Sequence, residues 1–453
     1  MKRSLVMLVV LALLLSVVAG ASAQAASRSY LILSNGNSFP RNLATQIAAA
    51  GGTITRTIPE VGIIVATSSN PNFSRSISGV RSVIANAVVQ WTDPNEQIIL
   101  DEDFGNPPSS GDNDTRFNLQ WGHDAVNAVE AWNAGQFGHG VRVAVLDSGI
   151  DADHPDIAPN LNTALSTSFV PGEGYDVHPG LYFNHGTHVA GTIGAADNGV
   201  GIIGVAPQVE LVAVKVLSEY SGSGSFEGVI AGIIYAASPA VDADIINMSL
   251  GGVLPRSGFV DDDGTVVGAN EVSELVVAIN RAVAYAYQQG TTVIVSAGND
   301  AIDRDHDANT WVLPADAPHA ITIAATAPVG WALDPTTNLN VPTSYTNFGR
   351  SRIDFAAPGG DIWDAVPASN CTVAGVTRPC YVFDLVFSAV SGGYGWAGGT
   401  SMAAPHVSGV AAIIIGENGG SMSPAHVEQA LRARAVGQGN DPYLGAGVVT
   451  TGY

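Results

Sequence analysis

Apolar, strand-like segments alternate with helix-like segments along most of the chain. From residue 117 onward they read, in order, VRVAVLD, HGTHVAGTIGAA, LVAVKVL, FEGVIAGIIYAA, ADIINMSL, ELVVAINRAVAYAYQQG, TTVIVSAGND and HAITIAA. Buried parallel strands form near-continuous apolar runs, and a crossover helix separates each from the next. The alternation therefore predicts an α/β fold over 117–453, a doubly wound parallel sheet with helices on both faces.

A smaller unit is predicted ahead of this sheet. Residues 28–91 show a strand, a helix, two strands, a second helix and a closing β-rich segment, at 30–33, 41–50, 53–58, 62–66, 71–77 and 83–91. This order is typical of a small α+β module. Residues 92–116 then lose periodicity and are rich in Asp, Pro, Gly and Ser, which predicts an acidic linker or exposed strap between two domains.

The first 23 residues predict a secretory signal peptide. Lys2 and Arg3 precede an apolar run over 5–18, and small residues follow up to Ala23. A retained membrane anchor is the alternative, but the apolar run is short for a membrane span and an A-x-A cleavage site follows it directly. We expect cleavage after Ala23 and a secreted, extracellular product without a membrane anchor.

The charge balance excludes some partners. Forty acidic residues against 18 basic ones give a net charge of −22, which argues against nucleic acid and anionic membrane surfaces and favours cations. An acidic surface that only keeps a secreted protein in solution is the alternative.

The chain has two cysteines, Cys371 and Cys380. In an oxidising compartment they predict one disulfide. A metal site would need further Cys or His residues at matched spacing.

Three polar residues stand where an open α/β sheet usually builds its site, at the carboxyl ends of strands and the starts of helices. Asp147 ends VRVAVLD, His185 opens HGTHVAGTIGA, and Ser401 lies in GGTSMAAPHVSGVAA. A serine hydroxyl is a poor nucleophile unless a base lies beside it and a third group fixes that base. Free N–H groups at a helix start could also hold a developing oxyanion.

Simpler interpretations of these residues remain. Ser401 and Thr400 could be helix N-caps, and His185 with His188 could be a metal pair, although the familiar zinc helix places its histidines four apart. The chain order Asp, His, Ser disfavours an α/β-hydrolase, in which the nucleophile comes first and lies in G-x-S-x-G.

Taken together, VAVLDSGIDADHPDI, NHGTHVAGTIGA and GGTSMAAPHVSGVAA resemble the three motifs of the subtilisin-like serine proteases, the subtilases. The segments GIIGVAP, NMSLGG, VIVSAGND and DFAAPGG support the resemblance, which runs from about residue 118 to the C-terminus. It implies a serine-type endopeptidase that hydrolyses peptide bonds in polypeptide substrates through an acyl-enzyme. It also implies that Asp147 orients His185, that His185 is general base and then acid, and that Ser401 is the nucleophile.

The resemblance implies further site residues. Asn299 would donate its side-chain amide to the oxyanion, together with the N–H of Ser401. Substrate would add as a β-strand between two segments whose glycines allow another backbone to approach. These segments are Ser249, Leu250, Gly251 and Gly222, Ser223, Gly224; a flexible surface turn is the alternative for the second.

A structural calcium ion is also implied, and no organic cofactor. Oxygen ligands of mixed type suit Ca²⁺, and a solvated acidic loop is the alternative. The implied ligands are the side chains of Asp156 and Asn198 and the carbonyls of Ala196, Val200 and Ile202. The acidic segments NDAIDRDHD and 261–263 could bind cations as well, although their spacing matches no defined site.

Finally, the resemblance implies that 28–91 is a ferredoxin-like propeptide that inhibits and chaperones the catalytic domain. The strap 92–116 would then lie near the active site and be cut by the enzyme itself, giving a monomeric mature protein. Pro405 leaves the carbonyl of Ser401 without its helical partner, and the insert 365–390 either shapes a substrate pocket or decorates the surface. Two other functions stay open: a processing protease of narrow specificity, and a catalytically silent binding protein with the subtilase fold.

Overall fold

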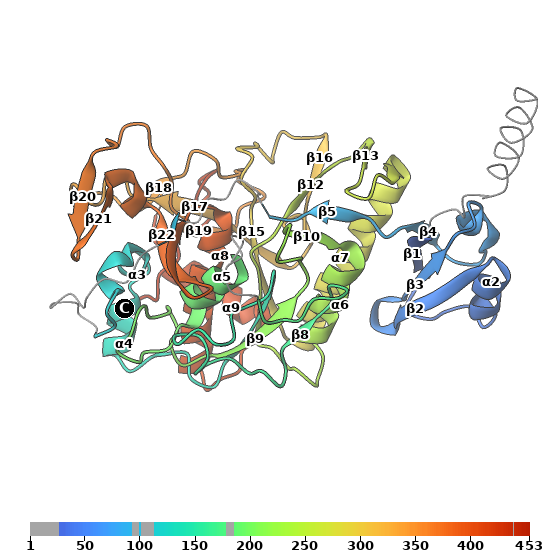
Figure 1. Ribbon diagram of the computed structural model, residues 1–453, viewed down its shortest axis with the longest axis horizontal. Coiled ribbons are helices and arrows are strands. Elements are labelled where there is room, and N and C mark those ends of the chain that lie inside the picture. Colours follow the sequence, from blue (N-terminus) through green and yellow to red (C-terminus); the bar gives the residue numbers. More distant parts are fainter. Residues whose placement is uncertain (1–26, 93–98, 101–112, 178–184, 438) are drawn as a thin grey trace, which may run out of the picture. The chain divides into compact units, whose positions relative to one another are not determined.

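The computed structural model describes residues 27–92, 99–100, 113–177, 185–437 and 439–453. It divides into one compact unit of residues 1–85 and another of residues 86–453 (Figure 1). The predicted signal peptide and most of the predicted strap lie outside the described residues. No helix in the described part of the chain is long and apolar enough to cross a membrane.

In its described residues, the N-terminal unit forms a four-stranded antiparallel sheet and one α-helix. The sheet order is β2-β3-β1-β4, and its core gathers Ile32, Leu43, Ile47, Ile64 and Phe73. The elements are β1 Arg28–Leu33, α2 Leu43–Ala49, β2 Gly52–Ile58, the 3₁₀ turn η1 Pro59–Val61, β3 Ile63–Ser68, the 3₁₀ turn η2 Phe73–Ser76 and β4 Ser82–Ala85.

The second helix predicted for this unit is wrong in type and length. The structure forms only the 3₁₀ turn η2, and Ile77 is already extended. Ser and Asn side chains there bond to nearby backbone groups; Asn70 Oδ1, for example, accepts the N–H of Asn72 at 3.0 Å. Such local bonds compete with an α-helix.

The C-terminal unit is built on one sheet, in the order β18-β17-β15-β11-β7-β9-β8, with β19 also paired to β17. All these pairings are parallel except β17 with β18. The strands are β7 Arg142–Asp147, β8 Thr167–Ser168, β9 Glu210–Lys215, β11 Ile245–Met248, β15 Thr292–Ser296, β17 Ala320–Ala327, β18 Val341–Pro342 and β19 Phe355–Pro358.

Helices cover both faces of this sheet (Figure 1). On one face α5, His185–Gly194, packs against α8, Thr400–Glu417, and on the other α6, Phe226–Ala236, packs against α7, Ala269–Gln289. Strand residues alternate between the faces: Val143 and Val145 join the core around α5 and α8, whereas Leu146 lies under Gly232 of α6. The predicted doubly wound α/β fold is confirmed.

Shorter elements surround the sheet. The helices and 3₁₀ turns are η3 Phe117–Leu119, α3 Trp121–Ala125, α4 Ala128–Asn133, η4 Cys380–Asp384 and α9 Pro424–Arg434. The paired ribbons are β5 Val88–Gln90 with β10 Ser223–Ser225, β12 Gly252–Pro255 with β16 Thr310–Leu313, β13 Gly258–Val260 with β14 Val266–Gly268, β20 Asn370–Val373 with β21 Val376–Pro379, and β22 Val386–Val390 with β23 Gly393–Ala397 and β6 Ile99–Leu100.

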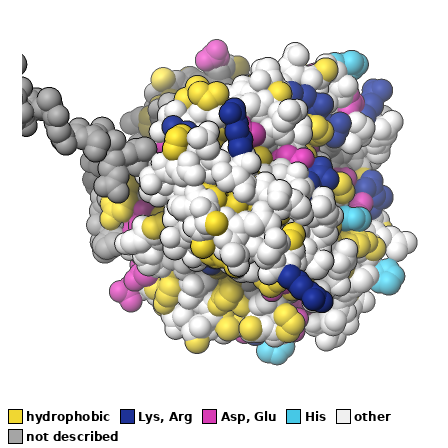
Figure 2. Space-filling model, turned by 90° about the vertical axis from the view of Figure 1, so that its right-hand side faces the viewer, with side chains coloured by type: hydrophobic (Ala, Val, Ile, Leu, Met, Phe, Trp, Pro, Cys, Tyr) yellow, Lys and Arg dark blue, Asp and Glu magenta, His cyan; other side chains and the backbone are white. Residues whose placement is uncertain are grey.

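Charged side chains are spread thinly over the face of the molecule shown in Figure 2. On the face shown in Figure 2, acidic, basic and apolar side chains lie interspersed among uncharged ones. This matches a chain in which only 13% of the residues are charged. On this face there is no broad patch of one sign for a highly charged partner.

Candidate active site

Asp147 and His185 form a buried pair at the carboxyl end of the sheet. Asp147 is the last residue of β7 and His185 the first of α5, and each side chain is 1% exposed. Nδ1 of His185 lies 2.8 Å from both carboxylate oxygens. A carboxylate only accepts, so Nδ1 carries the hydrogen and a neutral ring keeps Nε2 as its basic nitrogen.

Small residues let α5 lie close to the end of β7. A β-carbon at Gly186 would collide with the carbonyl oxygen of Gly149. It would also lie 3.1 Å from the β-carbon of Asp147. The N–H of Gly186 instead donates to Ser148 Oγ at 3.1 Å. The glycine of the HGTH motif is therefore what allows the His185 ring to reach Asp147.

The alternative of a metal pair on α5 is not supported by the side-chain directions. Nε2 of His188 bonds the carbonyl of Val386 at 3.1 Å, while Nδ1 of His185 faces Asp147. The two imidazoles thus bond different groups of the protein, and the described residues contain no group of three or more His, Cys, Asp or Glu arranged for a metal.

Ser401 is the second residue of α8 and is 5% exposed. Its hydroxyl lies 3.4 Å from the carbonyl oxygen of Ser249, to which it donates. At this position of a helix the backbone N–H has no intrahelical acceptor. Because α8 packs against α5, the serine motif lies on the same side of the sheet as the Asp147–His185 pair.

The carbonyl of Ser401 also bonds Ser249. Pro405 lies inside α8 and cannot supply the N–H that this carbonyl would normally accept. Instead the hydroxyl of Ser249 donates to it at 2.6 Å. The predicted gap in the helix is therefore closed by a predicted substrate-binding residue, a connection that the sequence does not reveal.

The Asn299 amide is oriented by Thr400. Its Oδ1 accepts the backbone N–H of Thr400 at 2.9 Å and the hydroxyl of Thr400 at 2.8 Å. Two donors on one atom fix that atom as the oxygen. The NH₂ group bonds no described residue, so it remains a donor for a ligand. Thr400 is a site residue that sequence reasoning treated only as a helix cap.

The two predicted substrate-binding segments hold a strand of the chain itself. β5 pairs antiparallel with β10, so that Val89 faces Gly224. Just beyond β5, Trp91 donates its N–H to Gly222 at 3.5 Å, and its carbonyl accepts from Gly251 at 2.7 Å. Residues 88–91 therefore lie between the two segments, as a peptide substrate would by β-strand addition.

Side chains of this strand fill an apolar space. Trp91 is 1% exposed, its ring centroid lies 4.9 Å from that of Phe226, and its Nε1 donates to Gly224 at 2.8 Å. A β-carbon at Gly252 would touch both Trp91 and Val89. The glycines thus leave room for large apolar side chains two positions apart. Leu250 is also buried.

The predicted calcium residues lie in two segments that contact each other: Asp156 follows β7, and residues 196–202 follow α5. Oδ1 of Asp156 lies 3.2 Å from the amide nitrogen of Asn198, and Oδ2 accepts the N–H of Ile202. The carbonyl oxygens of Ala196, Val200 and Ile202 accept no hydrogen bond from the described residues. The oxygen donors suit Ca²⁺, provided that Asn198 presents its amide oxygen to the ion.

The other acidic segments bond protein donors. In NDAIDRDHD, Asp305 accepts the backbone N–H groups of Arg350 and Ser351, and Arg304 pairs with Asp307 and Asp316. Asp261 caps a turn between β13 and β14.

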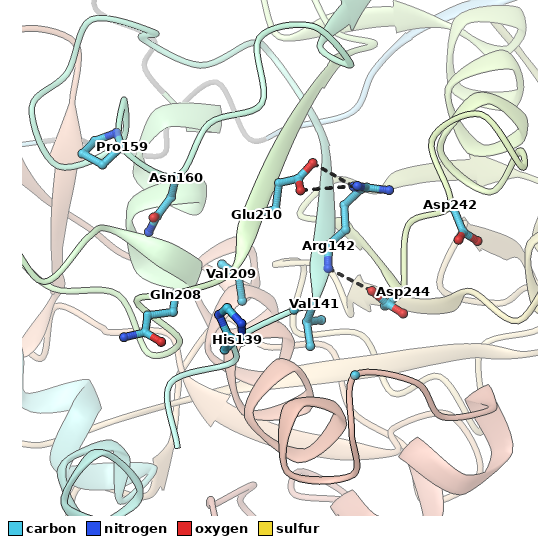
Figure 3. Close-up of a pocket in the computed structure, with 12 residues that line it drawn as sticks. His139, Val141, Arg142, Pro159, Asn160, Gln208, Val209, Glu210, Asp242 and Asp244 are labelled. Atoms are coloured by element: carbon cyan, nitrogen blue, oxygen red, sulfur yellow. Dashed lines mark hydrogen bonds and ion pairs between the residues drawn. The ribbon is translucent and has the colours of Figure 1, made fainter. Parts of the chain in front are cut away.

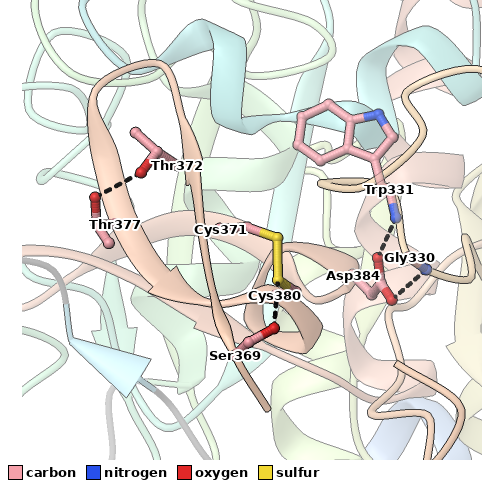
Figure 4. Close-up of a disulfide and its surroundings, with 8 residues drawn as sticks. All are labelled: Gly330, Trp331, Ser369, Cys371, Thr372, Thr377, Cys380 and Asp384. Atoms are coloured by element: carbon pink, nitrogen blue, oxygen red, sulfur yellow. Dashed lines mark hydrogen bonds between the residues drawn. A yellow bond between two sulfur atoms is a disulfide. The ribbon is translucent and has the colours of Figure 1, made fainter. Parts of the chain in front are cut away.

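Cys371 and Cys380 form the predicted disulfide, which joins β20 to the start of η4 (Figure 4). Beside it, Asp384 accepts the N–H groups of Gly330 and Trp331 at 2.7 Å each, and burial raises the pKa of Asp384 to about 6. The predicted insert 365–390 is more than decoration, because its strand β22 is fully buried and packs against α5.

A polar pocket of about 480 Å³ lies at the opposite end of the sheet (Figure 3). Arg142 opens β7 there, its guanidinium pairs with Glu210 at 2.9 Å, and its N–H donates to Asp244 at 2.9 Å. These charges already satisfy one another. Ligands of open α/β sheets bind at the carboxyl ends of the strands, where Asp147 lies.

Comparison with known proteins identifies the family of this chain. The model of the subtilase family matches residues 138–447. The chain belongs to the subtilase family. This subtilase is 33% identical over 331 residues to subtilisin NAT of Bacillus subtilis subsp. natto, covering 73% of this chain and 70% of that protein. It is equally identical over the same length to a subtilisin of Bacillus pumilus, of which it covers 96%. It is therefore a serine-type endopeptidase.

Solved structures share the fold of this subtilase. The epidermin leader peptide processing serine protease of Staphylococcus aureus superposes with a TM-score of 0.70 at 20% identity, covering 94% of this chain and 97% of that one. A lanthipeptide protease superposes with a TM-score of 0.58 at 25% identity, covering 77% and 98%.

Proposed function

We propose that this subtilase is a secreted endopeptidase made as a self-processing zymogen, with Asp147, His185 and Ser401 as its triad. The observation that carries the proposal is the buried His185–Asp147 pair at 2.8 Å on the side of the sheet where α8 presents Ser401. A fluorophosphonate probe should label the wild-type enzyme at Ser401 and leave His185→Ala almost unlabelled, since labelling requires the activated hydroxyl. Equal labelling of both proteins would exclude this triad.

The hydrogen bonds around the site indicate a catalytic role for each group. Nε2 of His185 takes the proton of Ser401 Oγ as the oxygen attacks the scissile carbonyl, and Asp147 stabilises the imidazolium. The oxyanion accepts from the Ser401 N–H and the Asn299 NH₂. The imidazolium then protonates the leaving amine, which leaves an acyl-enzyme. Water, deprotonated by the same nitrogen, releases the acid and regenerates Ser401.

We further propose that the enzyme is made inhibited, with a signal peptide over 1–23, a propeptide over 28–91, an activation strap over 92–116 and a monomeric catalytic domain over 117–453. Support comes from Trp91, whose backbone already bonds Gly222 and Gly251. The segment of Gly251 also contains Ser249, whose carbonyl oxygen accepts from the Ser401 hydroxyl at 3.4 Å. The bond that is cut would therefore follow Trp91, within the strap.

Charge also favours binding between the two parts. Residues 27–85 hold five arginines and one glutamate, whereas nearly all of the 40 acidic residues follow residue 85. Opposite net charges speed the association of two proteins, and salt weakens this attraction by screening it. The free propeptide is therefore expected to inhibit the mature enzyme in trans, most effectively at low ionic strength.

Calcium binding by Asp156, Asn198 and the carbonyls of Ala196, Val200 and Ile202 is part of the proposal. Its support is the three carbonyl oxygens that accept no bond from described residues. Bound Ca²⁺ would tie the loop after α5 to Asp156 and thereby hold α5 in place.

A processing protease of narrow specificity is the second candidate. The observation that favours it is the tight enclosure of Trp91 by Phe226 and Gly224, together with two structural neighbours that process leader peptides or lanthipeptides by name. A peptide library decides: one sharp cleavage motif indicates processing, and cleavage after many sequences indicates general proteolysis. Absence of hydrolysis with intact peptide binding would indicate the silent binding protein.

A further inference from the structure

The turn between β13 and β14 lies against the strand that occupies the substrate cleft. In this turn Asp261 accepts the N–H of Gly264 through its carbonyl at 2.9 Å. Its carboxylate Oδ1 accepts the N–H groups of Asp263 and Thr265 at 3.1 and 2.6 Å. Asp261 is only 7% exposed. These hydrogen bonds all lie within the turn.

The turn bonds the backbone of Val88 on both sides of that residue. The N–H of Asp262 donates to the Val88 carbonyl at 3.1 Å, and the Val88 N–H lies 3.4 Å from Asp261 Oδ2. Asp262 Oδ2 also accepts the hydroxyl of Ser223 in β10 at 3.0 Å. The turn is thus anchored to the same β10 segment that pairs with the peptide.

The peptide is consequently held along both edges. Successive residues of a strand direct their backbone groups to opposite edges. Val89 faces Gly224 of β10, and the Ala87 carbonyl accepts the N–H of Phe226, the first residue of α6, at 3.1 Å. Val88 faces the turn. Among the described residues, the turn is what bonds the backbone N–H and carbonyl of Val88.

We infer that the Asp261–Asp262 turn is a distal substrate subsite that recognises the main chain of a residue at least four positions before the bond that is cut. The count runs over Val88, Val89, Gln90 and Trp91, because the cut follows Trp91. The inference rests on the proposed function, in which β5 marks the place of substrate. Both contacts are to backbone atoms, so this subsite measures the length of an extended chain and selects long polypeptides over short peptides.

A proline substitution isolates the main contact. Asp262 is the second residue of a β-turn closed by the Gly264-to-Asp261 bond, the position at which proline is favoured, and its φ is not positive. Asp262→Pro therefore keeps the turn and removes the N–H that reaches Val88. Asp262→Ala is the matched control, because it removes the same carboxylate and keeps the N–H.

The first test uses the self-processed enzyme and two N-acetylated, internally quenched peptides with the sequence of residues 86–103 or 90–103. On the long peptide, kcat/KM of Asp262→Pro should be about 3- to 10-fold below that of Asp262→Ala, the worth of one hydrogen bond. On the short peptide the two variants should be equal. Equal values on the long peptide, or the same loss on both, overturn the inference.

The second test does not depend on hydrolysis, so failure of the proposed function is recognised separately. In full-length protein carrying Ser401→Ala, hydrogen exchange is measured over residues 86–92. Asp262→Pro should raise the exchange rate of this segment about 3- to 10-fold over Asp262→Ala. Identical rates overturn the inference even if the enzyme cleaves neither peptide.

Discussion

The hydroxyl of Ser249 donates a 2.6 Å hydrogen bond to the carbonyl of Ser401. Ser249 in turn accepts from the side-chain amide of Asn247 at 3.0 Å, and Asn247 accepts from Ser408 of α8 at 2.8 Å. All four residues are buried. The chain of bonds connects the floor of the substrate cleft to the first turn of α8, at the point where Pro405 interrupts the helical hydrogen bonds.

A double-mutant cycle tests whether Ser249 replaces the missing helical donor. In the Ser401→Ala background, which prevents self-digestion, Ser249→Ala should lower the free energy of unfolding by about 1–3 kcal/mol, because a buried carbonyl loses its donor. Pro405→Ala restores a helical N–H, so Ser249→Ala should then cost about 1 kcal/mol less. Ser249→Ala also removes the hydrogen bond that the Asn247 amide donates to Ser249. This loss is the same with Pro405 in place and in the Pro405→Ala variant, so it cancels in the cycle. Additive costs in denaturant unfolding would show that Ser249 has no such role.

Asn299 is predicted to act through its NH₂ group alone. Asn299→Asp keeps oxygens that can accept from Thr400 and removes the amide donor. Turnover should fall by about 100- to 1,000-fold with a small change in KM, a magnitude taken from a subtilisin, which is a relative of this chain. Thr400→Val, which leaves the NH₂ in place but loses the hydroxyl bond, should cost much less. A fall in kcat of less than tenfold for Asn299→Asp would remove Asn299 from the oxyanion site.

Three buried histidines predict acid sensitivity. Burial lowers the pKa of His123 and His188 to about 3 and that of His406 to about 4. The unfolded chain takes up these protons near pH 6.5, whereas the folded chain does not. The contribution of these histidines to the free energy of unfolding is therefore fully present above about pH 6.5. It is lost as the pH falls, by up to ~1.4 kcal/mol per pH unit for each histidine.

Two buried carboxyls act in the opposite sense below pH 6. Burial raises the pKa of Asp354 and Asp384 to about 6, so the folded chain binds these protons first and regains stability as the pH falls toward 4. The free energy of unfolding of Ser401→Ala protein is measured with denaturant from pH 7 to 4.5 and plotted against pH. The slope of this plot should be smaller in His123→Gln and larger in Asp384→Asn, in each case by the equivalent of about one proton. Unchanged slopes in both variants would contradict the account.

Calcium removal should destabilise the folded chain. An ion bound only by the native state adds stability by mass action, about 2.7 kcal/mol at 100 times its Kd. Chelator should therefore lower the melting temperature of Ser401→Ala protein, and Asp156→Asn should weaken the response. Asp305→Asn, in an acidic segment that bonds backbone N–H groups, should respond like the parent. Identical melting curves with and without chelator would exclude the site.

The sequence predicted those parts of the site that depend on local pattern. Asp147 was placed at a strand end and His185 at a helix start because apolar runs and glycine-rich helix starts mark such boundaries. Pairing partners were not predictable in this way. The sequence indicates that residues 83–91 form a β-rich segment that closes the small unit. In the structure β4 pairs with β1 of that unit, whereas β5 and its partner β10 both belong to the unit of residues 86–453. Alternating apolar side chains define a strand but not its neighbour.

Hydrogen bonds between residues far apart in the sequence could not be predicted either. Ser249 and Ser401 are 152 residues apart, and Val88 and Asp261 are 173 apart. No local pattern links such residues, because their contact follows from the packing of whole elements. The run 261–263 suggested only cation binding from its charge, whereas in the structure its backbone and carboxylates bond a neighbouring strand.

The most direct test of the account is the fate of the strap in purified, full-length protein. Wild-type chain and Ser401→Ala chain are incubated under identical conditions, and intact mass with N-terminal sequencing reports each product. The account predicts that the wild type is cut at one bond after Trp91 within the strap, while Ser401→Ala remains whole. Cleavage of Ser401→Ala at the same bond and rate, or a wild-type chain that stays whole, would contradict it.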